Sequence, residues 1–201
     1  MDEARLTRRR LIELGLALPL PVLLGARAAG AAGEPALLPP TLACDDGDEP
    51  TATNPAGPFF RPRSPRRRSL LRPGVAGTTL ILTGRVLTRG CTPIRGALLD
   101  FWQADARGRY DNRGYRFRGH QFTDRRGRYR LETVVPGLYP GRTRHIHVRV
   151  QGRGRPLLTT QLYFPGEPRN RSDGLFEPDL LVAWRGSGNR RLARFDFVLD
   201  D

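Results

Sequence analysis

The stretch "HIHVRV", residues 145–150, has the pattern of a short β-strand. It contains two of the three histidines in the sequence, His145 and His147. Successive side chains of a strand point to opposite faces, so residues two apart share a face. The two imidazoles therefore point the same way. Either they are a pair of metal ligands, or they are polar residues on the solvent face of an ordinary strand.

Apolar runs of strand length recur from residue 74 onward, at intervals set by Gly, Pro, Asn and Asp, and helical signals are scarce. The runs cover residues 78–87, 97–102, 127–135, 145–150, 158–164 and 194–199. Many short strands with turn-rich connections indicate an antiparallel sandwich or barrel. We expect residues 74–201 to form one all-β domain, an antiparallel β-sandwich with long loops.

Residues 34–73 are rich in Pro, Gly, Asp and Arg, and we expect them to form an extended arm ahead of the sandwich. The arm contains Cys44, and the sandwich contains Cys91, the only other cysteine. An oxidising compartment permits a disulfide, but the sequence does not show whether the two backbones come close enough. A bridge and two unpaired thiols both stay open.

Residues 1–33 have the features of an export signal. Arg8 and Arg9 open it, a mostly apolar run follows over residues 11–24, and small residues close it. The paired arginines indicate the Tat route, so we expect a periplasmic or extracellular protein. The apolar run is too short and too broken by proline to form a stable membrane span. A frayed amphipathic helix is the weaker alternative, because the run carries a single charge.

The formal charge of +14 comes from arginine alone, since all 34 basic residues are arginine. The arginines are scattered through strands, turns and arm alike, which indicates a compositional bias. A nucleic-acid surface would show a basic stripe with interleaved aromatic residues or a known motif, and neither is present. The densest cluster, at residues 61–68, lies in a segment broken by proline and is typical of a solvated linker. We therefore expect no nucleic-acid partner.

Two tyrosines lie in glycine-rich segments near the histidine pair. Tyr139 sits between turn formers just upstream of His145, and Tyr110 ends the phrase "DFWQADARGRY". Taken singly, each tyrosine is more typical of packing than of chemistry. A phenol has a pKa near 10, but a trivalent metal removes its proton at neutral pH. Two phenolates with two imidazoles would make a hard, anionic site suited to Fe(III).

The ordered phrases "DFWQADARGRY", "FRGHQFTDRRGRYRLETVVPGLYPGRTRHIHVRV" and "TTQLYFPGEP" resemble the intradiol ring-cleavage dioxygenases, whose best-known members act on catechol and protocatechuate. The resemblance covers most of residues 80–168. A lone H-x-H is weak evidence, but the ordered set of motifs is specific. The short connection from Tyr139 to His145 is similar to that in the exported branch of the protocatechuate 3,4-dioxygenase-like enzymes.

The resemblance implies a non-haem Fe(III) dioxygenase that uses O2 to cleave a catechol-type substrate to a cis,cis-muconate-type diacid. It assigns four metal ligands: Tyr110, Tyr139, His145 and His147, with Tyr139 and His147 as the axial pair. It implies that the Tyr139 phenolate leaves the iron when the substrate binds. It also implies that Arg142 stabilises negative charge on the substrate ring and that Gln161 lines the site. A solvated arginine and an outward strand residue are the alternatives for these two.

Some features leave other interpretations open. His120 falls at a position that is not a ligand in the family, so we expect a loop or pocket-rim residue. Residues 54–60 lack the acid and the final phenol of a phrase that often lines the family's pocket. A secreted β-sandwich module that binds aromatic or carbohydrate ligands without turnover is the rival function. A homo-oligomer stays open.

Overall fold

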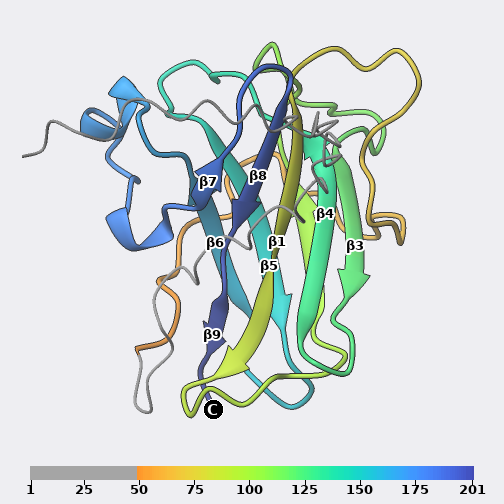
Figure 1. The fold of residues 1–201 in the computed structure, drawn as a ribbon, viewed down its shortest axis with the longest axis vertical. Coiled ribbons are helices and arrows are strands. Elements are labelled where there is room, and N and C mark those ends of the chain that lie inside the picture. The colour runs from red at the N-terminus through yellow and green to blue at the C-terminus, as the bar shows by residue number, and fades with distance from the viewer. Residues whose placement is uncertain (1–48) are drawn as a thin grey trace, which may run out of the picture. The chain divides into compact units, whose positions relative to one another are not determined.

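The computed structural model describes residues 49–201, which form nine strands and two short 3-10 helices arranged as two β-sheets (Figure 1). Residues 1–48, with the predicted export signal, Cys44 and the start of the predicted arm, lie outside the described residues. The all-β fold with two sheets rich in antiparallel pairs confirms the predicted sandwich class. Cys91, in the turn after the first strand, is disulfide-bonded. No helix within residues 49–201 is long and apolar enough to cross a membrane.

Five strands form one sheet, in the order β4-β1-β8-β7 with β9 also paired to β1, and four form the other, in the order β3-β2-β5-β6. The first sheet contains β1 (Thr79–Thr88), β4 (Arg128–Val134), β7 (Ala183–Arg185), β8 (Arg190–Arg194) and β9 (Phe197–Leu199). The second contains β2 (Leu98–Trp102), β3 (Arg118–Phe122), β5 (His145–Gln151) and β6 (Leu158–Tyr163). The 3-10 helices η1 (Pro168–Arg171) and η2 (Pro178–Leu180) lie between β6 and β7.

The strand predicted over residues 194–199 is in fact two strands. β8 ends at Arg194 and β9 begins at Phe197, and both pair parallel with β1. Between them the backbone of Phe195 approaches Gly84 so closely that a Cβ at Gly84 would lie 1.7 Å from the Phe195 carbonyl oxygen. Glycine at position 84 therefore permits the break.

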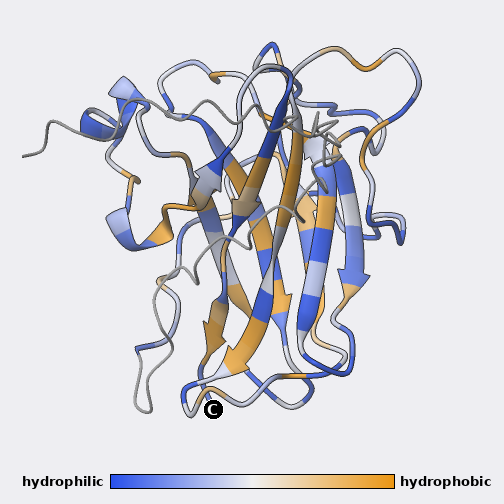
Figure 2. Cartoon of the chain, in the orientation of Figure 1, coloured by the Kyte–Doolittle hydropathy of each residue, from blue (hydrophilic) through white to orange (hydrophobic). Residues whose placement is uncertain are grey.

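The facing sides of the two sheets form the hydrophobic core. Leu80, Leu82 and Val86 of β1 are fully buried, as are Leu99 and Phe101 of β2. Figure 2 shows the resulting alternation, with apolar bands separated by polar ones along several strands. Burial of these side chains contributes most of the free energy that holds the sheets together.

The other face of the four-stranded sheet carries polar and aromatic side chains. Register places Arg118, Trp102, His147 and Gln161 in one row across β3, β2, β5 and β6. Residues 49–78 precede β1 without a helix or an extended strand, and their backbone pairs with this sheet at isolated points, such as Asn54 N–H to Thr159 O at 2.9 Å. We call residues 49–70 the arm segment. It covers the polar face and so separates it from solvent.

Candidate functional site

His145 and His147 stand side by side on β5, with ring centroids 4.8 Å apart and almost complete burial. The register of β5 with β6 sets them opposite Tyr163 and Gln161. The indole of Trp102, which lies across from His147 on β2, stacks on that imidazole with an interplanar angle of 3°. The shared face that the sequence predicts for the two histidines is therefore the covered, polar face of the sheet.

Tyr110 and Tyr139 reach the same place from two loops that touch each other. Gly108 has a positive φ, and a Cβ there would lie 2.0 Å from the Leu138 carbonyl oxygen. The N–H of Gly137 donates to Asp105 O at 2.8 Å, which joins the loops further. As a result the Tyr110 hydroxyl lies 3.2 Å from His145 Nε2, and the two phenol rings lie 5.8 Å apart.

Aspartates brace the Tyr110 loop on both sides of the tyrosine. Asp105 Oδ1 accepts the backbone N–H groups of Arg107 and Arg109, and Asp111 Oδ1 accepts that of Gly114 at 2.8 Å. Backbone N–H donors around Asp111 lower the pKa of its carboxyl to about 2. Both carboxylates are therefore ionised at neutral pH, and they fix the loop by local hydrogen bonds.

Burial sets the protonation of the histidines and of Tyr110. It lowers the pKa of His145 to about 4 and that of His147 well below its usual range, so both rings are neutral at neutral pH. His145 Nδ1 donates to Thr143 O at 2.7 Å, which leaves the lone pair on the Nε2 that faces Tyr110. Burial also raises the pKa of the Tyr110 phenol above its ordinary value.

The donor set fits a hard trivalent cation. Within residues 49–201 no group of three or more His, Cys, Asp or Glu side chains is close enough to hold a metal ion. The donors beside the two imidazoles are phenol oxygens instead. A metal ligand must offer an unprotonated donor atom, and a neutral imidazole already has one such nitrogen. A phenol in this buried place ionises only if a cation supplies the compensating charge, and two phenolates would balance most of the charge of a trivalent ion.

Arg142 and Gln161 also meet at this site, in direct contact. Arg142 Nη2 donates to Gln161 Oε1 at 2.7 Å, and Arg142 Nε donates to the buried carboxylate of Asp173 at 2.9 Å. The Arg142 charge is close enough to oppose protonation of His145 and His147 and to favour ionisation of Tyr110. All six candidate residues therefore converge on one end of the polar face.

Sequence reasoning missed Phe59, Arg118 and Asp173. The Phe59 ring stacks on Tyr110, with centroids 4.4 Å apart, and meets Tyr139 edge-on at 5.3 Å. The Arg118 guanidinium is buried and donates to the carbonyl oxygens of Phe59 and Asp111. No local pattern distinguishes this arginine from the others in the sequence. Phe59 lies in residues 54–60, the segment that departs from the family pattern. That departure was the one feature of the sequence that pointed to this residue.

His120 lies in a strand and not in a loop, so the loop alternative predicted for it is wrong. It is part of β3, and its Nδ1 contacts the Ser64 carbonyl oxygen at 2.7 Å. The Ser64 hydroxyl donates to Asp100 Oδ1 at 2.6 Å. The serine proton is therefore directed to the carboxylate and not to the imidazole, unlike a serine nucleophile. The three residues attach the arm segment to the sheet.

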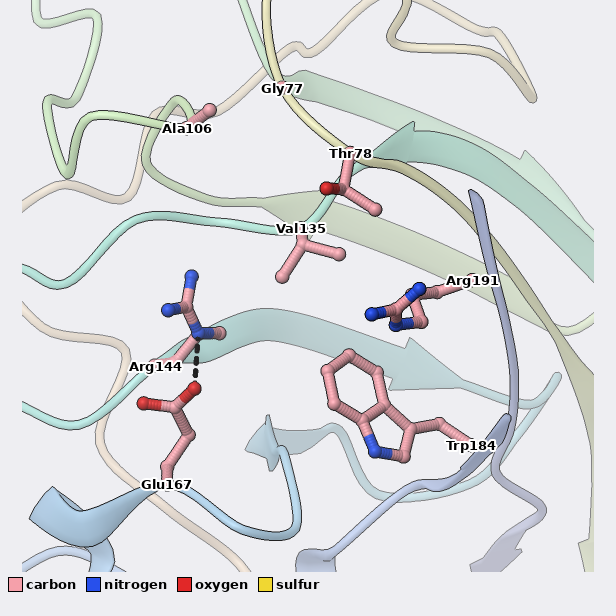
Figure 3. A pocket seen from close by; sticks show the side chains of 8 residues that line it. All are labelled: Gly77, Thr78, Ala106, Val135, Arg144, Glu167, Trp184 and Arg191. Atoms are coloured by element: carbon pink, nitrogen blue, oxygen red, sulfur yellow. Dashed lines mark hydrogen bonds and ion pairs between the residues drawn. The ribbon is translucent and has the colours of Figure 1, made fainter. Parts of the chain in front are cut away.

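A separate cavity of about 310 Å³ has Arg144, Glu167, Trp184 and Arg191 among its lining side chains (Figure 3). Its walls include Ala106, Val135 and Arg144, which belong to the segments that carry Tyr110, Tyr139 and His145. Figure 3 shows Arg144 paired with Glu167 in this wall, and their Nε and Oε1 atoms are 2.8 Å apart. None of the six candidate residues lines the cavity, so it is not part of the site.

A family model described as Dioxygenase matches residues 56–200. The chain is 37% identical over 119 residues to the protocatechuate 3,4-dioxygenase beta chain of Burkholderia cepacia, which covers 50% of this chain and 51% of that protein. It is 30% identical over 147 residues to hydroxyquinol 1,2-dioxygenase of Rhizobium sp. (strain MTP-10005), which covers 60% of this chain and 50% of that protein. The chain thus spans about half the length of these curated relatives.

Solved structures are similar over the same region. The dioxygenase domain of a dioxygenase and carbohydrate-binding protein fusion from Streptomyces sp. SirexAA-E is 57% identical, with a TM-score of 0.74, and the match covers 76% of this chain and 99% of that one. The 3-chlorocatechol 1,2-dioxygenase of Rhodococcus opacus 1CP is 30% identical, with a TM-score of 0.71, and the match covers 76% of this chain and 73% of that one.

Proposed function

The chain belongs to the intradiol ring-cleavage dioxygenase family, and from this premise we propose that it is a non-haem Fe(III) dioxygenase acting on a catechol-type diol. It inserts both atoms of O2 into the aromatic ring and yields a cis,cis-muconate-type diacid. The observation that supports the proposal best is the convergence of two phenols and two neutral imidazoles from separate segments of the chain.

In this proposal Tyr110, Tyr139, His145 and His147 hold the iron. Bound Fe(III) supplies the Lewis acidity that ionises the phenols and makes a catecholate reactive toward O2. The chain's own groups prepare the site for it. The Thr143 carbonyl fixes the tautomer of His145, and the Trp102 ring fixes the plane of His147.

Tyr139 and Arg142 act on the substrate. With iron bound, the Tyr139 phenolate oxygen would accept the proton that a catechol hydroxyl loses on binding, a general-base role. The Arg142 guanidinium, held by Gln161 and Asp173, stabilises the negative charge of the bound catecholate ring. The arm segment keeps water away, because it covers the polar face on which these groups lie.

The proposed substrate class is the catechols, with or without ring substituents. The curated relatives include a protocatechuate 3,4-dioxygenase chain, a hydroxyquinol 1,2-dioxygenase and a chlorocatechol 1,2-dioxygenase. Phe59 occupies the part of the arm segment that packs on both phenols, so its ring restricts the room beside the ligands. A panel of catechols with different substituents is therefore the right test set.

The test is to load the purified protein with Fe(III), record its visible spectrum and measure oxygen uptake with that panel. We expect a reddish phenolate-to-iron absorption, oxygen consumption and a diacid product. Protein that stays colourless after loading would overturn the iron site. Colour and catechol binding without oxygen consumption would instead identify the rival, a binding module without turnover.

We further propose that residues 1–33 direct export through the Tat route to the periplasm or beyond. The paired Arg8 and Arg9 ahead of an apolar run support this. Replacing both by lysine should leave full-length protein inside the cell. The unaltered chain should appear outside the inner membrane with a mass that lacks roughly the first 30 residues. An unprocessed chain of full mass in both cases would contradict the proposal.

A further inference from the structure

Asp173 is a buried carboxylate that lies just after η1 and is held entirely by the chain around the site. Arg142 Nε donates to both of its oxygens, at 3.0 and 2.9 Å. The backbone N–H of Thr143 donates to Oδ2 at 2.8 Å, and that of Leu175 donates to Oδ1 at 3.0 Å. A carboxylate so enclosed is stable only because it is fully paired.

The pairing fixes the orientation of the Arg142 guanidinium. Nε and Nη2 form one edge of this planar group, and Asp173 and Gln161 occupy both positions. Nη1 takes part in neither of these two contacts. The free end of the guanidinium is thus the part left to meet a substrate.

The same carboxylate also supports a candidate ligand. Its partner Thr143 is fully buried, and the Thr143 carbonyl accepts the Nδ1–H of His145 at 2.7 Å. Asp173 therefore holds the side chain of Arg142 and the backbone N–H of Thr143, shortly before β5 begins at His145. Movement of its carboxyl group would shift Arg142 and the support of His145 together.

A closed circuit of hydrogen bonds completes the arrangement. Leu175 O accepts from Asn54 Nδ2 at 2.8 Å, and Asn54 Oδ1 accepts from Gln161 Nε2 at 2.9 Å. Gln161 Oε1 in turn accepts from Arg142, which returns the circuit to Asp173. Each member of the circuit restricts the movement of the next. The Arg142 guanidinium is therefore already oriented before a substrate binds.

We propose that Asp173 is a positioning residue, which holds Arg142 in the orientation that stabilises charge on the substrate. The inference rests on the proposed function. It adds to that function a residue that is not one of the proposed metal ligands. Partners in the outer shell of a site typically change activity by about 10- to 100-fold when lost. An error of about 1 Å in placing a catalytic group has a similar effect.

Asp173→Asn keeps the shape of the side chain but removes its charge and one acceptor oxygen. Glu167→Gln is the matched control, because Glu167 pairs with Arg144 on the same loop but in the wall of the separate cavity. We expect kcat to fall about 10- to 100-fold in the Asp173 variant, with KM within about threefold. The control should stay within about twofold. Equal losses in both variants would mean that the carboxylate only braces the loop, which would overturn the inference.

A double-variant comparison tests whether the effect passes through the guanidinium. In an Arg142→Ala background, Asp173→Asn should lower kcat by less than about twofold further, because nothing is left to position. Losses that multiply in the double variant would overturn the inference. The Asp173→Asn and Arg142→Ala proteins must both retain cooperative unfolding for the comparison to hold.

A measurement without turnover separates this inference from the proposed function. The Arg142 Nε–H resonance, assigned by its loss in Arg142→Lys, can be followed by NMR in protein whose iron is exchanged for diamagnetic Ga(III). We expect its exchange with water to be at least about tenfold slower than that of exposed arginines, and fast in Asp173→Asn but not in Glu167→Gln. A fast-exchanging signal in the unaltered chain would refute the positioning role, whereas absent oxygen uptake alone would refute the proposed function.

Discussion

Arg118 shows how much one side chain contributes when its charge is buried. Arg118 is 1% exposed, and its guanidinium donates to the carbonyl oxygens of Phe59 and Asp111, which belong to the arm segment and to the Tyr110 loop. We expect Arg118→Leu to lower the free energy of unfolding by about 3 kcal/mol, because both carbonyl groups lose a charged donor. Urea denaturation measures this directly.

Arg116, two residues earlier, is the control for that substitution. It is exposed and lies over the ring of Phe117. Arg116→Leu should change the free energy of unfolding by less than about 0.5 kcal/mol. Similar losses at both positions would show that arginine content matters and not the place of Arg118.

Tyr110 offers a test of the metal site by the loss of a single atom. Tyr110→Phe keeps the ring that stacks on Phe59 but removes the oxygen 3.2 Å from His145 Nε2. We expect affinity for Fe(III) to fall at least about tenfold and the visible absorption to weaken, because one phenolate donor is gone. Tyr115→Phe is the control, since that hydroxyl donates to Pro62 O away from the cluster. Unchanged colour in the Tyr110 variant would exclude it as a ligand.

At the scale of the element, the two tyrosine loops depend on glycine at their contact. Gly108→Ala would place a Cβ 2.0 Å from the Leu138 carbonyl oxygen at a φ of +79°. Gly74→Ala has nearly the same φ, +78°, with no atom within 4 Å. The first variant should lose about 2 kcal/mol more stability than the second, together with Fe(III) affinity, because the loops must separate. If thermal unfolding gave equal stabilities for the two variants, the contact between residue 108 and the Leu138 carbonyl oxygen would be able to relax at little cost, against this prediction.

The loop after Tyr110 should loosen in acid. The depressed pKa of Asp111, about 2, means that its carboxylate stabilises the fold above the unfolded value near 3.8. That stabilisation is lost as the pH falls through about 2, when the folded form also takes up the proton. The stability difference between the unaltered chain and Asp111→Ala should therefore be constant above about pH 5 and shrink between pH 4 and 2. A stability difference that instead grew as the pH fell would contradict the lowered pKa of Asp111.

Strands with an apolar pattern were predictable, whereas elements defined by contacts were not. His145 and His147 share a face because strand geometry requires it, and the structure places them as expected. Strand β3, "RGHQF", has no apolar alternation, and it is a strand because it pairs with β2 beneath the arm segment. The role of Asp173 was equally invisible, since its partners lie about 30 residues away in the sequence and no local pattern marks a buried ion pair.

At the scale of the whole described chain, the site is a meeting point of distant segments. The arm segment contributes Phe59, the loop after β2 contributes Tyr110, and the loop before β5 contributes Tyr139. The segment after η1 contributes Asp173. No single element contains the site. The positions of its side chains therefore depend on how all the segments of residues 49–201 pack together.

The arm segment should therefore be part of the metal centre and not a dispensable extension. Gly57 lies against the His147 ring, where a Cβ would be 3.4 Å from Cε1, and Asn54 and Pro55 O hold the Gln161 amide. A variant lacking residues 1–60 should bind Fe(III) at least about tenfold more weakly than one lacking residues 1–48, because His147 and Gln161 become solvated. Circular dichroism would confirm that both retain β-structure. Equal Fe(III) affinity and equal visible spectra would show that the sheet and its loops hold the metal without the arm segment.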